Sequence, residues 1–432
     1  MTVVSSLGRV VQAARGPLLG TSAILVATTV MTAGLGFVYW WFAARTFSPE
    51  AVGLAAATVS AMTLLGYLAM LGLGTLLISE VHRQPGRQRA YVAAATIASG
   101  LAGLALGTAA GLVAPWIAPN LSTLVDAPGG QALFTLGVGL TAASFVLDQA
   151  VVGLLQARWR LIRNGIFALG KLALLAIAAL ALSASSGVDL YVTWVAGLGL
   201  SVVVLGAIAL WQEPSWRAYR PDWAILRHLG SGALAHHALN LAVQAPSLAL
   251  PVVVAVVLST ATAGYFYAAW MLAGFVSVGT SALSLTLFAV GARDRSDLAR
   301  SLRVSLPVSL ALVLLAVLAL LLLGPAVLRA FGGAYAETAF LSLMVLSLAA
   351  APGAVKAHFV QIARIGGRIF LAAGLMVALA VLEICVAGAG AMLGGLDGMV
   401  IGYALVVTAE ASIMLPPVLR AARITSAPLA PA

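Results

Sequence analysis

Twelve long apolar segments fill most of this 432-residue chain, and they constrain its fold more than any other feature. Each could form a helix that crosses a membrane, which needs about 20 apolar residues. Strands of a membrane barrel would be about 10 residues long with alternating polarity, unlike these segments. The expected spans are 18–43, 51–79, 91–118, 132–156, 163–183, 189–211, 232–258, 263–290, 303–324, 338–362, 368–393 and 397–419. The sequence therefore predicts an all-α membrane protein with twelve transmembrane helices.

Positive charge recurs in alternate gaps between these segments. All but four of the 23 basic residues fall in gaps of one parity or at the chain ends, and the exceptions are Arg45, Arg329, Lys171 and Lys356. Because short cytoplasmic loops of membrane proteins carry the excess of Lys and Arg, this pattern places both termini in the cytoplasm. A nucleic-acid-binding protein would gather its charge on one face. We therefore read the net charge of +10 as an orientation signal, and expect no nucleic-acid partner.

The two halves of the chain resemble each other. With an offset of 211 residues, Ser48 aligns with Ser259 and Gly53 with Gly264, each pair at the same junction between segments. Six spans per half is an even number, so both halves would insert the same way up, as a parallel repeat. We expect an amino-terminal six-helix lobe over 1–211 and a carboxy-terminal lobe over 232–432.

The central gap, 212–231, is the longest and links the two expected lobes. Trp216, Trp223 and Leu226 recur at helical spacing among arginines, which is typical of an amphipathic helix on the membrane surface. We favour the simpler interpretation, a cytoplasmic linker that acts as a hinge.

Two lysines lie inside apolar segments, one in each half. Lys171 is eight residues from Arg163, and Lys356 is eight residues from Arg364. This spacing puts each lysine about 12 Å along a helix from the inner flank. Two ammonium groups at one depth could bind an anionic headgroup in a central cleft. Alternatively, each lysine stem could extend its charge toward the inner interface.

Three carboxylates also lie within the spans, where ionisable groups are costly and usually functional or paired. Asp148 and Glu410 are each ten residues from an inner arginine, about 15 Å along a helix, and Glu383 lies closer to the outer side. Each could take up a proton or cation, or act as the counter-charge of a buried lysine. The sequence does not indicate which.

The seventh segment carries a polar stripe. His236, Asn240, Gln244 and Ser247 share one helical face, which should contact protein or water rather than lipid. It could line a cavity or form interhelical hydrogen bonds. At the offset of 211, Asn240 aligns with Thr29 on the first segment.

Motifs for catalysis are missing from the sequence. There is no G-x-x-x-x-G-K-[ST] phosphate loop, no G-x-S-x-G elbow and no His-rich metal motif, and Cys385 is the only cysteine. We therefore expect no enzyme activity, no cofactor and no metal.

The stretch SPEAVGL at Ser48–Leu54, its echo at Ser259–Tyr265 and the twelve spans in two halves together resemble one superfamily. It is the multidrug/oligosaccharidyl-lipid/polysaccharide exporter superfamily, and the chain most resembles its polysaccharide-type flippases. The resemblance implies two lobes around a central cavity. It also implies alternating access that moves an undecaprenyl-pyrophosphate-linked oligosaccharide across the bacterial inner membrane, for surface polysaccharide synthesis.

On this hypothesis the two lysines bind pyrophosphate. His236, Asn240, Gln244 and Thr29 contact the saccharide, and Asp148, Glu383 or Glu410 couples an ion or supplies counter-charge. The expected partners are the lipid-linked glycan, membrane lipids and a polysaccharide polymerase.

Three alternatives stay open. A cation-coupled multidrug antiporter of the same superfamily resembles a design with a carboxylate in the first helix, and segment 18–43 has none. A major facilitator would also have twelve spans in parallel halves. A membrane-embedded glycan ligase or acyltransferase would need acid and base residues near one surface, where the short outer gaps offer few.

Overall fold

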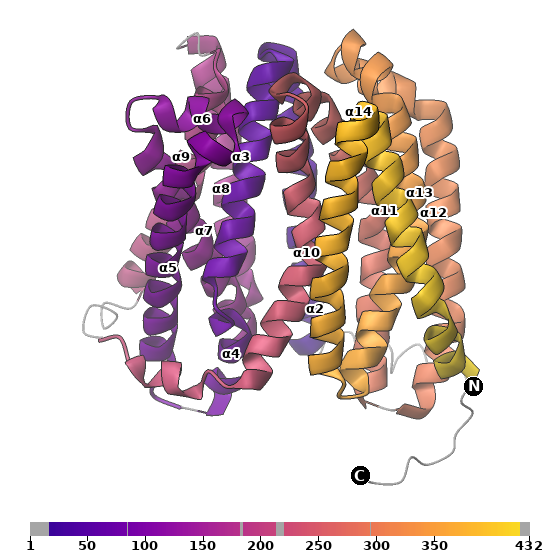
Figure 1. Cartoon of the computed structure of the whole chain (residues 1–432). Coiled ribbons are helices and arrows are strands. Elements are labelled where there is room, and N and C mark those ends of the chain that lie inside the picture. Colours follow the sequence, from indigo (N-terminus) through magenta and orange to yellow (C-terminus); the bar gives the residue numbers. More distant parts are fainter. Residues whose placement is uncertain (1–16, 84, 182–184, 213–219, 294, 424–432) are drawn as a thin grey trace, which may run out of the picture. The chain divides into compact units, whose positions relative to one another are not determined.

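The computed structural model describes residues 17–83, 85–181, 185–212, 220–293 and 295–423. These residues form helices joined by short connections, with no strand among them (Figure 1). Ten helices are long and apolar enough to cross a membrane. The helix α14 (Ile369–Arg423) holds two apolar segments, and α2 (Pro17–Thr46) is 30 residues long. The helical membrane fold is therefore confirmed, and its helix count is consistent with about twelve spans.

The helices group into two compact units. The first comprises the described residues of 1–46 and 61–237, and the second those of 47–60 and 238–432. Two helices, α3 (Pro49–Ala69) and α10 (Ser231–Val257), supply residues to both units. The proposed lobes over 1–211 and 232–432 stay a prediction.

The first unit is built on a close pair of helices, α5 (Gln88–Ile117) and α7 (Gly130–Gly153). Gly103 and Gly107 of α5 face α7, and a β-carbon on Gly103 would lie 2.9 Å from the Gly139 α-carbon. Small residues at this spacing let two backbones approach closely in lipid. The other helices that lie wholly in the first unit are α2, α4 (Leu73–Glu80), η1 (Val81–Arg83), α6 (Pro119–Asp126), α8 (Ala157–Ala181), α9 (Gly187–Gln212) and η3 (Trp223–His228).

One predicted span is interrupted. Segment 51–79 was expected as a single helix, but α3 ends at Ala69 and α4 begins at Leu73. Leu71 and Gly72 between them have φ angles of 52° and 79°, in the left-handed region. An apolar run does not reveal such a break, because leucine rarely adopts a positive φ.

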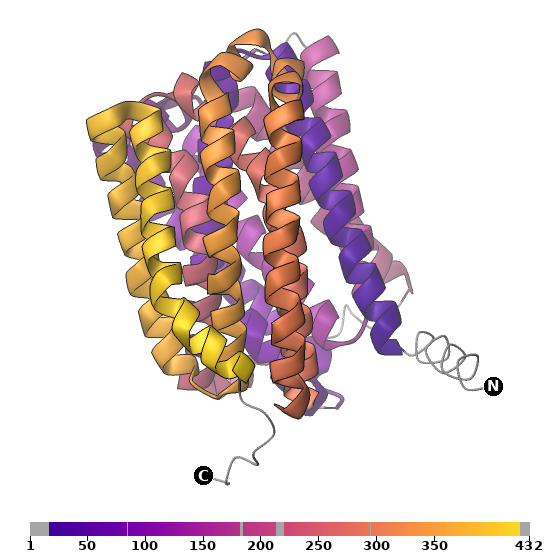
Figure 2. The same ribbon diagram turned by 90° about the vertical axis from the view of Figure 1, so that its right-hand side faces the viewer.

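The second unit consists of the first part of α3, most of α10, and the helices α11 (Thr260–Arg293), α12 (Arg295–Phe331), α13 (Gly333–Ile365) and α14. The helix α13 packs against α11, α12 and α14. Within α14, Gly394 and Gly395 leave the helical conformation and divide it into two arms, which lie side by side in Figure 2. These arms match the predicted spans 368–393 and 397–419.

The central linker is only partly described. Residues 213–219, including Trp216, lie outside the described residues, so the amphipathic interpretation is testable only for the short helix η3. There, Trp223 and Leu226 are exposed and Ile225 is buried. The Asp222 side chain accepts hydrogen bonds from the Ala224 backbone N–H at 3.0 Å and from Arg87 Nε at 2.7 Å. The Ala224 bond is the main cause that lowers the pKa of Asp222, and Arg87 lowers it further.

Candidate functional site

A lysine and two glutamates meet inside the second unit. Lys356 of α13 donates hydrogen bonds to Glu383 on the first arm of α14 and to Glu410 on its second arm, the latter at 2.9 Å. The Lys356 side chain is 12% exposed and each glutamate 2%. With one cation and two anions, the ionised triad has a net charge of −1. The Glu410 Oε1 atom has no hydrogen-bond partner among the described residues.

The geometry of this triad allows it to bind either a proton or a cation. The lysine neutralises one carboxylate, so the second can accept a proton or a cation at the free Glu410 oxygen. Ion pairs buried this deeply hold together only while their charges are matched, because removing one partner leaves an uncompensated charge in a medium of low dielectric constant. A proton taken up by either glutamate would therefore weaken the hold on the Lys356 ammonium.

Asp148 pairs with arginine rather than with lysine. Its carboxylate accepts two hydrogen bonds from Arg163, at 2.8 and 2.7 Å, and one from Asn164 at 3.2 Å. The Arg160 Nε atom lies 3.7 Å from the same carboxylate. Asp148 is on α7 and the other three are on the first turns of α8. The two parallel N–H···O bonds fix the Arg163 guanidinium in the fork geometry typical of strong arginine–carboxylate pairs.

Lys171 of α8 lies in a cage of aromatic rings in the first unit. Its ammonium is 3.4 Å from the centre of the Trp194 ring, 4.7 Å from that of Phe167 and 4.9 Å from that of Tyr39. The residue is 3% exposed. In the described part of the chain its charge is therefore held by ring faces, an arrangement worth about 2 kcal/mol or more when desolvated.

The residues of the polar stripe on α10 differ in their contacts and in their exposure. Asn240 accepts a hydrogen bond of 2.6 Å from Arg364, Ser247 donates to the Gln244 carbonyl, and the Gln244 side chain is exposed. His236 is half-buried on the same helix. Thr29 lies exposed on α2, in the first unit.

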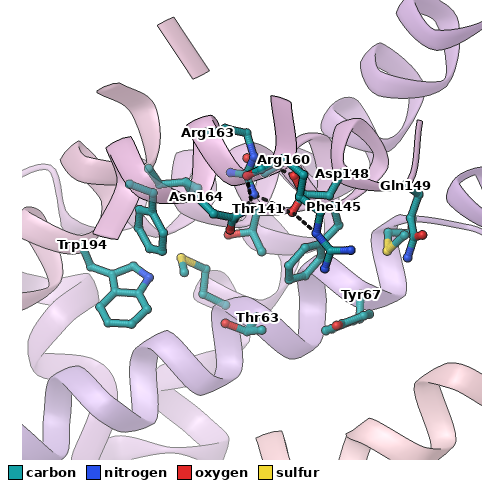
Figure 3. Close-up of a pocket in the computed structure, with 15 residues that line it drawn as sticks. Thr63, Tyr67, Thr141, Phe145, Asp148, Gln149, Arg160, Arg163, Asn164 and Trp194 are labelled. Atoms are coloured by element: carbon teal, nitrogen blue, oxygen red, sulfur yellow. Dashed lines mark hydrogen bonds and ion pairs between the residues drawn. The ribbon is translucent and has the colours of Figure 1, made fainter. Parts of the chain in front are cut away.

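A cavity of about 270 Å³ opens inside the first unit, beside Asp148. Figure 3 shows Asp148, Arg160 and Arg163 along one side of it, with Thr63 and Tyr67 opposite. Trp194 closes one end and Gln149 the other. Among the predicted site residues only Asp148 lines this cavity.

Sequence reasoning missed Arg160, Arg163 and Trp194 as site residues. The two arginines were counted with the cytoplasmic flanks, because they follow an apolar segment. A useful signal was available, since Asp148 is an acid inside a span and needs a partner within reach. In the described residues no group of three His, Cys, Asp or Glu side chains is arranged to hold a metal ion.

Comparison with known families supports the resemblance first seen in the sequence. Residues 18–220 match a family described as polysaccharide biosynthesis protein. No curated protein sequence matches the chain significantly.

Solved structures show the same fold. An inward-facing multidrug resistance MATE family transporter of the MOP superfamily aligns with a TM-score of 0.69 and 15% identity, over 91% of this chain and 96% of that one. Lipid II flippase MurJ in an inward closed conformation aligns with a TM-score of 0.70 and 12% identity, over 92% of this chain and 89% of that one. The chain thus has the fold of these MATE and MurJ structures.

Proposed function

We propose that this protein is a flippase that moves a lipid-linked oligosaccharide, carried on undecaprenyl pyrophosphate, across the bacterial inner membrane. The observation that carries the proposal is the match of residues 18–220 to a polysaccharide biosynthesis family, in a chain whose fold is shared with a lipid II flippase. Its partners would be the lipid-linked glycan, membrane lipids and a polysaccharide polymerase, with both termini in the cytoplasm. Movement would follow alternating access, without enzyme chemistry.

Within this function, Lys171 and Lys356 bind pyrophosphate, as the sequence suggested, but under different conditions. Lys171 is held by uncharged rings, so no carboxylate has to be displaced before its ammonium meets an anion. Lys356 is held by Glu383 and Glu410. Because phosphate and carboxylate compete for the same ammonium, Lys356 takes up phosphate only when a glutamate is protonated. The triad thereby couples substrate binding to proton uptake.

The polar groups of α10 and α2 supply contacts for the saccharide. His236, Asn240 and Gln244 lie on one face of α10, and Thr29 lies on α2. Sugar hydroxyls pair well with amide and imidazole groups, which can both donate and accept hydrogen bonds. In this scheme Asp148 does not serve as the counter-charge of a buried lysine, since its charge is already matched by Arg163.

Complementation in the host tests the function. The gene is deleted, and wild type, Lys171→Ala, Lys356→Ala and the double variant are expressed at matched membrane levels. Arg329→Ala, an exposed position away from the site, is the control. Surface polysaccharide and lipid-linked intermediates are both measured. We expect the deletion to lose surface glycan and to trap the intermediate, with rescue by wild type and Arg329→Ala.

Full rescue by both lysine variants would show the pyrophosphate assignment to be wrong. An unchanged amount of surface polysaccharide in the deletion strain would show the flippase proposal itself to be wrong.

A second candidate is a cation-coupled multidrug antiporter. It is favoured by the similarity of the fold to a multidrug resistance MATE transporter and by the two buried glutamates at Lys356. A deletion strain with unchanged surface polysaccharide and altered drug sensitivity would support the antiporter function.

A further inference from the structure

The cavity of the first unit is walled by polar atoms that lack a hydrogen-bond partner. Three such atoms belong to residues that line it, namely Arg163 Nη1, Arg160 Nε and Ser144 Oγ. Arg163 is 3% exposed and Ser144 is 2% exposed. Buried polar atoms in proteins are nearly always paired, because an unpaired one forfeits the hydrogen bonds it would make in water. Three around a single cavity indicate that it is built for a ligand.

The unpartnered atoms define what the ligand must offer. Guanidinium nitrogens are donors only, and a hydroxyl can donate as well as accept. The missing partner is therefore a group with at least two acceptor oxygens. A carboxylate or a phosphate meets this requirement, and both match the planar fork of arginine.

The net charge of the cavity wall favours an anionic ligand over water. Arg160 and Arg163 carry two positive charges on the cavity wall, and Asp148 carries the one negative charge among its lining residues. The wall therefore has a surplus of one positive charge. Water could satisfy the hydrogen bonds but would leave this surplus in place, whereas an oxyanion matches it.

Size and shape favour one charged group with its neighbouring atoms. The volume of about 270 Å³ lies just below the range of roughly 300–1,000 Å³ that drug-sized ligands occupy. Tyr67, Phe145 and Trp194 supply aromatic walls against which a sugar ring or an isoprenoid can pack. The Arg160 side chain remains 35% exposed, so the arginine wall can be reached by solvent.

We infer that this cavity is a binding site for an oxyanion of the transported substrate, held by Arg160, Arg163 and Ser144 and fixed in place by the Asp148–Arg163 pair. The inference rests on the proposed function. The oxyanion is either the phosphate of the lipid carrier or the carboxylate of an acidic sugar.

Binding to the purified full-length protein tests this site. The probes are farnesyl pyrophosphate, inorganic pyrophosphate and glucuronate, titrated by calorimetry in detergent with zwitterionic lipid. Arg160→Gln removes one donor and the surplus charge at a partly exposed position, so it should still fold. Arg158→Gln is the matched control, because Arg158 lies on the same helix turn but is exposed and does not line the cavity.

We expect Arg160→Gln to weaken binding by about ten- to a hundredfold, the usual effect of losing a hydrogen bond to a charged group. Arg158→Gln should bind as wild type does. An affinity for both pyrophosphates that Arg160→Gln lowers identifies the carrier phosphate as the ligand of this cavity, and binding of glucuronate alone, lowered in the same variant, identifies an acidic sugar. Equal affinity in the two variants, or no binding of any probe by wild type, overturns the site.

The flippase function and the oxyanion site can be disproved independently of each other. Trapping of the intermediate in the deletion strain tests the flippase without reference to this cavity. A wild type that rescues export, together with normal binding by Arg160→Gln, would remove the oxyanion site and leave the flippase standing.

Discussion

Gly53 of α3 and Gly264 of α11, the two glycines that the internal repeat aligns, touch each other in the folded chain. A β-carbon on Gly53 would lie 2.6 Å from the Gly264 amide nitrogen and 1.7 Å from the Thr260 carbonyl oxygen. Both residues belong to the second unit. This close approach leaves no room for a side chain at either glycine.

The glycine contact should tolerate no side chain. We expect Gly53→Ala to destabilise the protein by about 1–3 kcal/mol or more, because the methyl group would overlap backbone atoms that cannot rotate away. Gly274→Ala on α11 is the control, since a β-carbon there would meet no atom within 4 Å. An alanine in that open helical position should be neutral or stabilising. Thermal unfolding in detergent measures both variants, and equal midpoints would contradict the predicted overlap.

The triad should be more sensitive to the loss of one charge than to the loss of all three. Lys356→Ala leaves two buried carboxylates facing each other, and we expect about 3–5 kcal/mol of destabilisation. Combining Lys356→Met with Glu383→Gln and Glu410→Gln removes every charge and should restore most of that stability. Denaturant unfolding of the single and triple variants checks this. A triple variant no more stable than Lys356→Ala would show that the charges are not the reason.

Substitution of Lys171 can separate an effect on protein stability from an effect on transport. In Lys171→Met the flexible stem is kept, and the sulfur can pack on Trp194, Phe167 and Tyr39 as the ammonium did. Since a lone buried ammonium is costly, we expect the folded protein to be at least as stable as wild type. Export should nevertheless fall in the complementation assay. A variant that transports normally would show that the Lys171 charge is dispensable.

The attachment of η3 should depend on pH through Asp222. Its pKa is lowered in the folded protein, so its contribution is fully present above the ordinary carboxyl pKa and is lost as the pH falls through the lowered value. Hydrogen exchange of the peptide over 220–230, corrected for the intrinsic rate, should therefore speed up only in strong acid. In Asp222→Ala we expect fast exchange already at neutral pH. Protection that is unchanged in this variant would contradict the role of Asp222.

The sequence predicted the membrane fold well, because its signals are additive over long stretches. Hydropathy located the spans to within a few residues at most ends. The break at Leu71 and Gly72 was missed, since a positive φ at leucine leaves no trace in hydropathy.

The chemistry of the site was less accessible from sequence. Residues 356, 383 and 410 were each singled out as charges in an apolar setting, but their meeting depends on how α13 and the two arms of α14 pack. Arg163 was assigned to a flank by its neighbours, although α8 begins at Ala157 and buries it. The aromatic cage of Lys171 draws on α2, α8 and α9, and no local pattern joins residues that far apart.

The turn inside α14 bears on how the protein is made. Gly395 has φ 62° and ψ −147°, a conformation almost restricted to glycine, and the two arms approach so closely there that a β-carbon on Gly390 would lie 2.3 Å from the Gly398 carbonyl oxygen. Each arm carries one glutamate, which is expensive to insert into a bilayer alone. Synthesis reaches Lys356 before either of them. The order of the chain thus places the Lys356 cation in the nascent protein before either acid, so that it can pair with Glu383 when that residue enters the bilayer.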